Sequence, residues 1–188
     1  MPHPPQITRD HLIETAWQMA EADGLEALSL AKLAGAMGIK APSLYHHVSS
    51  KAQLLKAVNE LTNQRLFSAI NDGLNGTGSS PLEKLTAVAH TQRIFAQKHP
   101  VTYMLAFTTV EAEARPDPAQ QAQSALPLQA IMAEISGEQD SLAALRGALA
   151  LIHGFIMLEL NQQFQRGGDL DEAFTSAIEA YLRGWERG

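Results

Sequence analysis

Four side chains that donate hydrogen bonds lie close together between positions 43 and 47: Ser43, Tyr45, His46 and His47. Lys40 precedes this run, and Lys51 follows it. Hydroxyl, imidazole and ammonium groups in this order suit contact with phosphates and with the edges of bases. The pattern indicates binding to an anionic polymer, provided that the surrounding chain exposes these groups.

The residues around this run predict a scaffold that would expose it. Ser29 is a good helix cap, Gly38 ends the helix that follows, and Pro42 suits the first turn of another short helix. Two short helices joined by a turn form the helix-turn-helix pattern. The polar face of the second helix is then free to enter a major groove, while apolar residues hold the two helices together: Leu33, Ala34, Met37, Leu44 and Val48.

The distribution of charge agrees with this interpretation, although the net charge of −6 does not favour nucleic acid. Residues 1–56 hold five bases and five acids, so the whole negative excess lies in residues 57–188. From Ala27 to Asn59 there are four lysines, two histidines and no acid. This stretch predicts a modest positive patch on an acidic molecule.

Continuous matches over about residues 8–58 resemble the TetR family of bacterial transcriptional regulators. They include Ala22-Asp-Gly24, Met37-Gly-Ile39 and above all Ser43-Leu-Tyr-His-His-Val48 followed by Ser50-Lys51. The resemblance implies a homodimer that binds a palindromic DNA operator and responds to a small molecule, most often as a repressor. It implies DNA contacts from Ser29, Lys40, Ser43, Tyr45, His46, His47 and Lys51.

A second resemblance covers the C-terminal part. His99-Pro100, Arg146 and His153-Gly154 look like the subgroup of these regulators with a Trp-His-Gly signature, with Leu149 where the Trp is expected.

Hydrophobic periodicity predicts an all-α fold of about nine helices. The expected ranges are 8–23, 29–37, 42–48, 50–70, 81–98, 101–110, 119–135, 139–165 and 170–183. Residues 1–7 are expected to form a flexible arm and residues 71–80 a loop. Pro127 is expected to kink or break its helix.

The predicted domains are a DNA-binding domain at residues 1–56 and a ligand-binding and dimerisation domain at 57–188. The last two long helices are expected to pair with those of a second copy. An apolar stripe on the first of them suits this role: Leu142, Leu145, Leu149, Ile152, Ile156 and Leu160.

Candidate effector contacts in the second domain are Met104, Phe107, His153, Phe155 and Met157. With an acidic domain around them, they predict a small, largely hydrophobic effector that is neutral or cationic. The sequence has no cysteine and none of the common nucleotide, hydrolase or zinc-protease motifs, so we expect no catalytic residue, cofactor or metal site. The longest charge-free apolar run is too short for a membrane span, which predicts a cytoplasmic protein without membrane contact.

Two other classes of function stay open at this point. An all-helical ligand-binding or enzymatic bundle would use the helix-turn-helix only as structure, and the absence of acids from Ala27 to Asn59 speaks against this. A protein-interaction module would expose apolar residues on the third helix, where Ser, Tyr and His stand instead.

Overall fold

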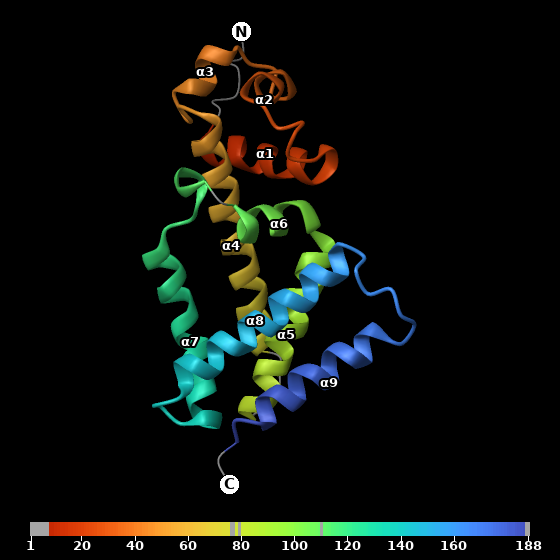
Figure 1. Ribbon diagram of the computed structural model, residues 1–188. Coiled ribbons are helices and arrows are strands. Elements are labelled where there is room, and N and C mark those ends of the chain that lie inside the picture. Colours follow the sequence, from red (N-terminus) through yellow and green to blue (C-terminus); the bar gives the residue numbers. More distant parts are fainter. Residues whose placement is uncertain (1–7, 76–77, 79, 110, 187–188) are drawn as a thin grey trace. The chain divides into compact units, whose positions relative to one another are not determined.

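The computed structural model describes residues 8–75, 78, 80–109 and 111–186, and there the chain is helical (Figure 1). Over this described part it forms nine α-helices and one 3-10 turn, with no strand, which confirms the predicted all-α fold. The chain divides into two compact units: one runs to Arg65 and also contains His99–Asp117, and the other contains Leu66–Lys98 and the chain from Pro118 onwards. The predicted arm at residues 1–7 lies outside the described residues.

The first unit forms around an apolar core that its helices share. Leu12, Leu33, Leu44 and Leu54 are each 0% exposed in it, and Leu105 joins them from a segment much later in the chain. The elements of this unit are α1 (Arg9–Asp23), α2 (Leu30–Ala36), α3 (Ala41–Tyr45), the first part of α4 (Lys51–Asn75), α6 (Pro100–Thr108) and the 3-10 turn η1 (Ala112–Ala114).

Short-range sequence signals set the ends of these helices. The Thr8 hydroxyl accepts a hydrogen bond from the His11 amide at 3.2 Å and caps α1. Gly24, with a φ of +81°, ends α1 in a conformation that costs other residues more.

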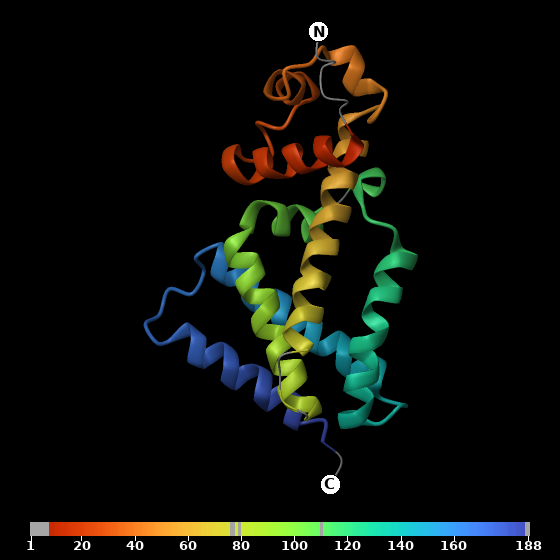
Figure 2. The ribbon, with the colours of Figure 1, turned by 180° about the vertical axis from the view of Figure 1, so that it is seen from behind.

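The second unit contains the end of α4 with α5 (Pro81–Lys98), α7 (Pro118–Ser136), α8 (Ser141–Leu160) and α9 (Leu170–Arg183). Helix α8 packs against α5, α7 and α9, and α9 also packs against α5 (Figure 2). The Tyr181 hydroxyl of α9 donates to the Ala144 carbonyl of α8 at 2.9 Å. A Cβ on Gly147 would lie 1.9 Å from that hydroxyl oxygen, so the glycine makes room for the ring.

The expected C-terminal ends of α4 and α8 were wrong. Helix α4 continues to Asn75, because Leu74 extends the stripe of Leu66 and Ile70 at four-residue spacing. Helix α8 ends at Leu160 instead of Gln165, since Gln162 takes a φ of +54°. Helix α7 continues through Pro127, where a kink or a break was expected. The carbonyl that the proline leaves without a donor belongs to exposed Gln123, where water can satisfy it, and Leu128 and Met132 are buried after the proline.

Helix α8 is long enough and apolar enough to cross a membrane, with a mean hydropathy of 1.7. In this structure 33% of its most apolar stretch is buried. Its buried residues face α5, α7 and α9, as those of a core helix do. Among its apolar residues, Leu142, Ala143, Ala150 and Leu158 are exposed.

Candidate nucleic-acid interface and effector region

Gly38 sets the angle at which α3 leaves α2. Its φ is +67°, in the left-handed region. Its amide donates to the Gly35 carbonyl at 3.1 Å, and the Ile39 amide donates to the Ala34 carbonyl at 3.0 Å. These two bonds satisfy the last carbonyls of α2 and turn the chain sharply. Leu44 of α3 is then buried in the core, which leaves the opposite side of α3 outside.

The predicted DNA-contacting groups of α3 do lie on the surface. Tyr45 is 53% exposed although it is a large aromatic residue. Lys40, Ser43 and His46 are exposed as well, while His47 is partly buried. The structure therefore gathers hydroxyl, imidazole and ammonium groups on one short segment.

The third helix is shorter than expected. It ends at Tyr45, and His46 is its C-cap, so His46 and His47 lie in the following turn. The His47 and Val48 amides both donate to the Leu44 carbonyl, at 2.9 and 3.1 Å. Val48 is 1% exposed, and anchoring it in the core ends the helical path early.

Lys51 and Ser29 both lie at helix N-termini, but Lys51 is exposed whereas Ser29 is partly buried. Ser50 accepts from the Gln53 amide at 3.1 Å, and Gln53 in return accepts from the Ser49 amide at 2.6 Å, so Lys51 begins α4 in an exposed position. The Ser29 hydroxyl accepts from the Lys32 amide at 3.2 Å and caps α2. Its role in DNA contact stays a prediction, as do those of the other six residues.

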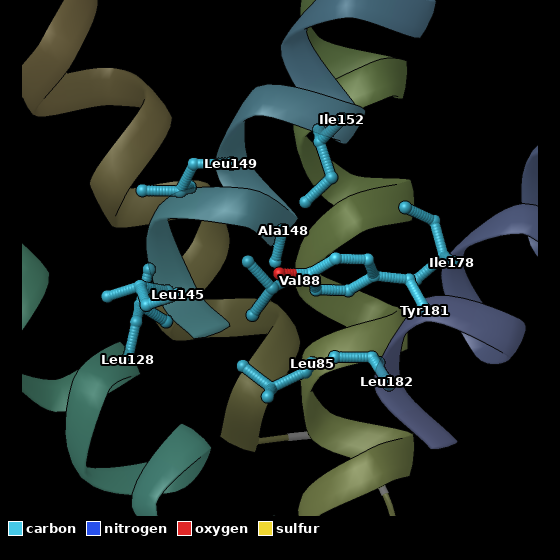
Figure 3. A pocket seen from close by; sticks show the side chains of 10 residues that line it. All are labelled: Leu85, Val88, Leu128, Leu145, Ala148, Leu149, Ile152, Ile178, Tyr181 and Leu182. Carbon is cyan, nitrogen blue, oxygen red and sulfur yellow. The ribbon is translucent and has the colours of Figure 1, made fainter. Parts of the chain in front are cut away.

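The second unit contains a small apolar cavity of about 20 Å³, about the room that one water molecule needs (Figure 3). The Tyr181 ring borders it, but its hydroxyl is bonded to Ala144. The cavity lies among α5, α7, α8 and α9 and is lined by Leu85, Val88, Leu128, Leu145, Ala148, Leu149, Ile152, Ile178, Tyr181 and Leu182.

The five expected effector contacts do not line this cavity, and they fall in two units. Met104 and Phe107 belong to α6 of the first unit, where the Phe107 ring lies 4.6 Å from that of Tyr103. His153, Phe155 and Met157 belong to α8 of the second unit. Burial lowers the pKa of His153.

Sequence reasoning missed a polar cluster beside Phe155. Arg93 of α5 donates two hydrogen bonds of 2.7 Å to Glu159 of α8 and lies 2.8 Å from Asp171 of α9. Its guanidinium carbon lies 5.1 Å from the ring centre of Phe174 and 5.6 Å from that of Phe155. Hydrogen bonding to Glu159 raises the pKa of Arg93. No local pattern predicts this cluster, since α5 is far in sequence from α8 and α9.

The expected dimerisation stripe needs a correction. Leu145, Ile152 and Ile156 are at most 4% exposed within one chain, so they pack against its own helices. Leu142, at 43%, is exposed. The spacing of the apolar residues predicts an amphipathic helix, but it does not predict whether its apolar face packs within one chain or against a second copy.

Among the residues that the structure describes, no group of three or more His, Asp or Glu side chains is placed to hold a metal ion.

Comparisons with known proteins agree along the whole chain. A family model described as bacterial regulatory proteins, tetR family, matches residues 12–58, and one described as tetracyclin repressor-like, C-terminal domain, matches residues 85–181. The chain is 31% identical over 189 residues to an HTH-type transcriptional regulator of Mycobacterium tuberculosis, covering 98% of this chain and 84% of that protein. It is 28% identical to the regulator YobS of Bacillus subtilis, covering 95% and 92%.

Two further similarities concern part of the chain and the fold. The transcriptional repressor KstR2 of Mycolicibacterium smegmatis is 38% identical over 87 residues, covering 46% of this chain and 42% of that protein. A solved structure of a protein of unknown function from Rhodococcus superposes with a TM-score of 0.81 at 24% identity, covering 99% of this chain and 98% of that one.

Proposed function

Since the chain belongs to the TetR family of bacterial transcriptional regulators, we propose that it represses transcription by binding a palindromic operator as a homodimer, and that a small effector releases it. The observation that carries the proposal is the surface of hydrogen-bond donors on α3, which is exposed because Leu44 on the opposite side of the helix is buried. This surface lies within the stretch from Ala27 to Asn59, which contains no acidic residue. Regulators of this family act by binding and are generally not enzymes. We place the protein in the cytoplasm, where its DNA is.

Binding to DNA is tested with a duplex selected from a random-sequence pool. Affinity should fall as salt rises from 50 to 200 mM, because cationic groups displace counterions from phosphates. Lys51→Ala should weaken binding to all sequences and reduce the slope of log affinity against log salt by about 1 for each copy, and so by about 2 for the homodimer. Lys84→Ala, on α5 of the second unit, is the matched control and should leave that slope unchanged. An affinity independent of salt would exclude direct DNA binding.

For the dimer we propose the outward faces of α8 and α9. Ala143 and Ala150 of α8 are exposed, as are Ala173 and Ala180 of α9. Small side chains allow helices to approach closely. Exposed Leu142 continues this face at one end of α8.

Ala150→Glu tests this interface. Two copies of the new carboxylate would be buried near a two-fold axis, so sedimentation velocity should find monomers. Ala130→Glu, an equally exposed change on α7, should leave the dimer intact. A dimeric Ala150→Glu variant would place the interface elsewhere.

For the effector we propose a small, largely hydrophobic molecule, neutral or cationic, that binds the core of the second unit. The apolar cavity and the net charge of −6 in residues 57–188 support this class. Release of a labelled duplex identifies effectors from a compound library, with carboxylates of matched size as the comparison. A strongly anionic effector would contradict the charge argument.

Two variants locate the effector. Ala148→Leu fills the cavity, whereas His153→Ala removes the polar group among the predicted contacts of the second unit, His153, Phe155 and Met157. Loss of release in His153→Ala, with dimer and DNA binding intact, supports those contacts. A monomeric or unfolded His153→Ala protein would make His153 structural, and loss of release only in Ala148→Leu would place the effector in the cavity.

A further inference from the structure

The N-terminus of α6 is capped by a residue of another helix. His99, the N-cap residue, makes no side-chain capping bond. Instead, the Glu21 carboxylate of α1 accepts hydrogen bonds from two backbone amides of α6, that of Thr102 at 2.8 Å and that of Val101 at 3.4 Å. It also accepts a hydrogen bond from the Thr102 hydroxyl. A carboxylate at this position satisfies free amides and meets the positive end of the helix dipole.

A cluster around Trp17 of α1 reinforces the same junction. The His99 ring lies edge-on to the Trp17 ring, with centres 4.8 Å apart. The indole nitrogen of Trp17 donates to the Thr62 hydroxyl of α4 at 3.1 Å. Arg65 of α4 stacks 4.3 Å from the centre of the Trp17 ring and pairs with Glu14 of α1. The start of α6 therefore contacts α1 directly and α4 through one shared aromatic ring.

The segment His99–Asp117, which begins with α6, is also attached to α4 near its C-terminal end. Asn59 of α4 is fully buried and donates to the Ala114 carbonyl at 2.8 Å. Between the two attachments, Leu105 of α6 is 7% exposed and belongs to the same core as Leu12 and Leu44. These contacts make α6 part of the unit that carries α3.

The position of α6 in the sequence gives these contacts a consequence. Helix α5 of the second unit ends at Lys98, and α6 begins at Pro100, so one residue separates them. We propose that Glu21 is a positioning residue that locks α6 to α1, so that a displacement at the end of α5 is carried by α6 into the DNA-binding unit. The proposal rests on the repressor function proposed above and assigns its coupling to a particular carboxylate.

Amide hydrogen exchange of the full-length protein tests the lock without an effector. In Glu21→Ala the α6 amides from Val101 to Leu105 should exchange about fivefold faster, as expected when a helix loses its cap. Adding the selected duplex to the native protein should slow exchange in α3 and, through the lock, in α6. In Glu21→Ala the duplex should still slow α3 but no longer α6.

Two controls separate the lock from general effects. Asp23→Ala removes an exposed acid from the same helix and should behave like the native protein. Glu21→Gln keeps an acceptor oxygen and should recover part of the protection.

Each adverse outcome has its own meaning. Equal α6 exchange in Glu21→Ala and the native protein, or a duplex effect on α6 that survives the substitution, overturns the lock. Faster exchange throughout α2 as well as α6 would mean general destabilisation and also overturns it. Absence of duplex protection in α3 of the native protein would instead remove the repressor function, and the lock with it.

Discussion

Arg93→Met should destabilise the protein far more than loss of any exposed ion pair. Arg93 is 6% exposed and Glu159 16% exposed at their side chains, so removing the cation leaves a mostly buried carboxylate without its paired charge, although the Gln97 amide still donates to it at 3.1 Å. Breaking a buried pair in this way costs about 3–5 kcal/mol. For a chain of this size each kcal/mol lowers Tm by about 2–4 °C, which gives a decrease of about 6–20 °C.

Thermal unfolding followed by circular dichroism, at one fixed protein concentration, measures this decrease. Asp171→Asn is the control: its side chain is 83% exposed, and losing that pair, with its charge in the first turn of α9, should cost about 1 kcal/mol. The double variant Arg93→Met with Glu159→Leu should recover most of the loss, because an apolar pair has no charge to desolvate. If Arg93→Met cost no more than Asp171→Asn, the cluster would contribute nothing beyond a surface pair.

Two further predictions concern the second unit. Burial lowers the pKa of His90 and of His153, so both histidines take up protons less readily when folded than when unfolded. Their contribution to stability is complete above about pH 6.5 and is lost as pH falls towards the lowered values, so urea midpoints should fall from pH 7.5 to 5.5, and less so in the double change to Asn. Gly147→Ala should cost about 1–3 kcal/mol by driving a methyl group into Tyr181, whereas Gly35→Ala, with nothing within 4 Å of the new Cβ, should not destabilise the fold in urea unfolding.

Local chemistry explains which parts of the fold were predictable. The caps at Thr8 and Ser29 and the turn at Gly38 depend on a few neighbouring residues, so the sequence alone predicts them. The early end of α3 was not predictable, because it depends on Val48 reaching a core formed by other helices. The exposed face of α3 followed from the position of Leu44 in the helical period.

Contacts between distant segments explain the rest. Glu159 lies 66 residues after Arg93, and no spacing rule links two residues on separate helices. The cavity lining has the same composition as any helical core, so sequence cannot mark it out. Helix α6 belongs to the first unit through the hydrogen bonds of Glu21 with Thr102 and of Asn59 with Ala114. Both Glu21 and Asn59 are polar residues for which the sequence alone predicts no partner.

The sparse charge of the DNA-binding surface bears on how such a regulator is released. Each copy offers few cations around a five-residue helix, and Lys56 is engaged with Glu60 at 3.9 Å. Few phosphate contacts mean modest affinity for one copy, so in the proposed homodimer tight binding requires both copies to dock at the correct spacing. An effector then needs to disturb only that spacing: a preference of about 3 kcal/mol for the other arrangement reduces DNA affinity by about 100-fold. A lysine-rich surface would hold DNA in either arrangement, so low charge makes geometry the controlling variable.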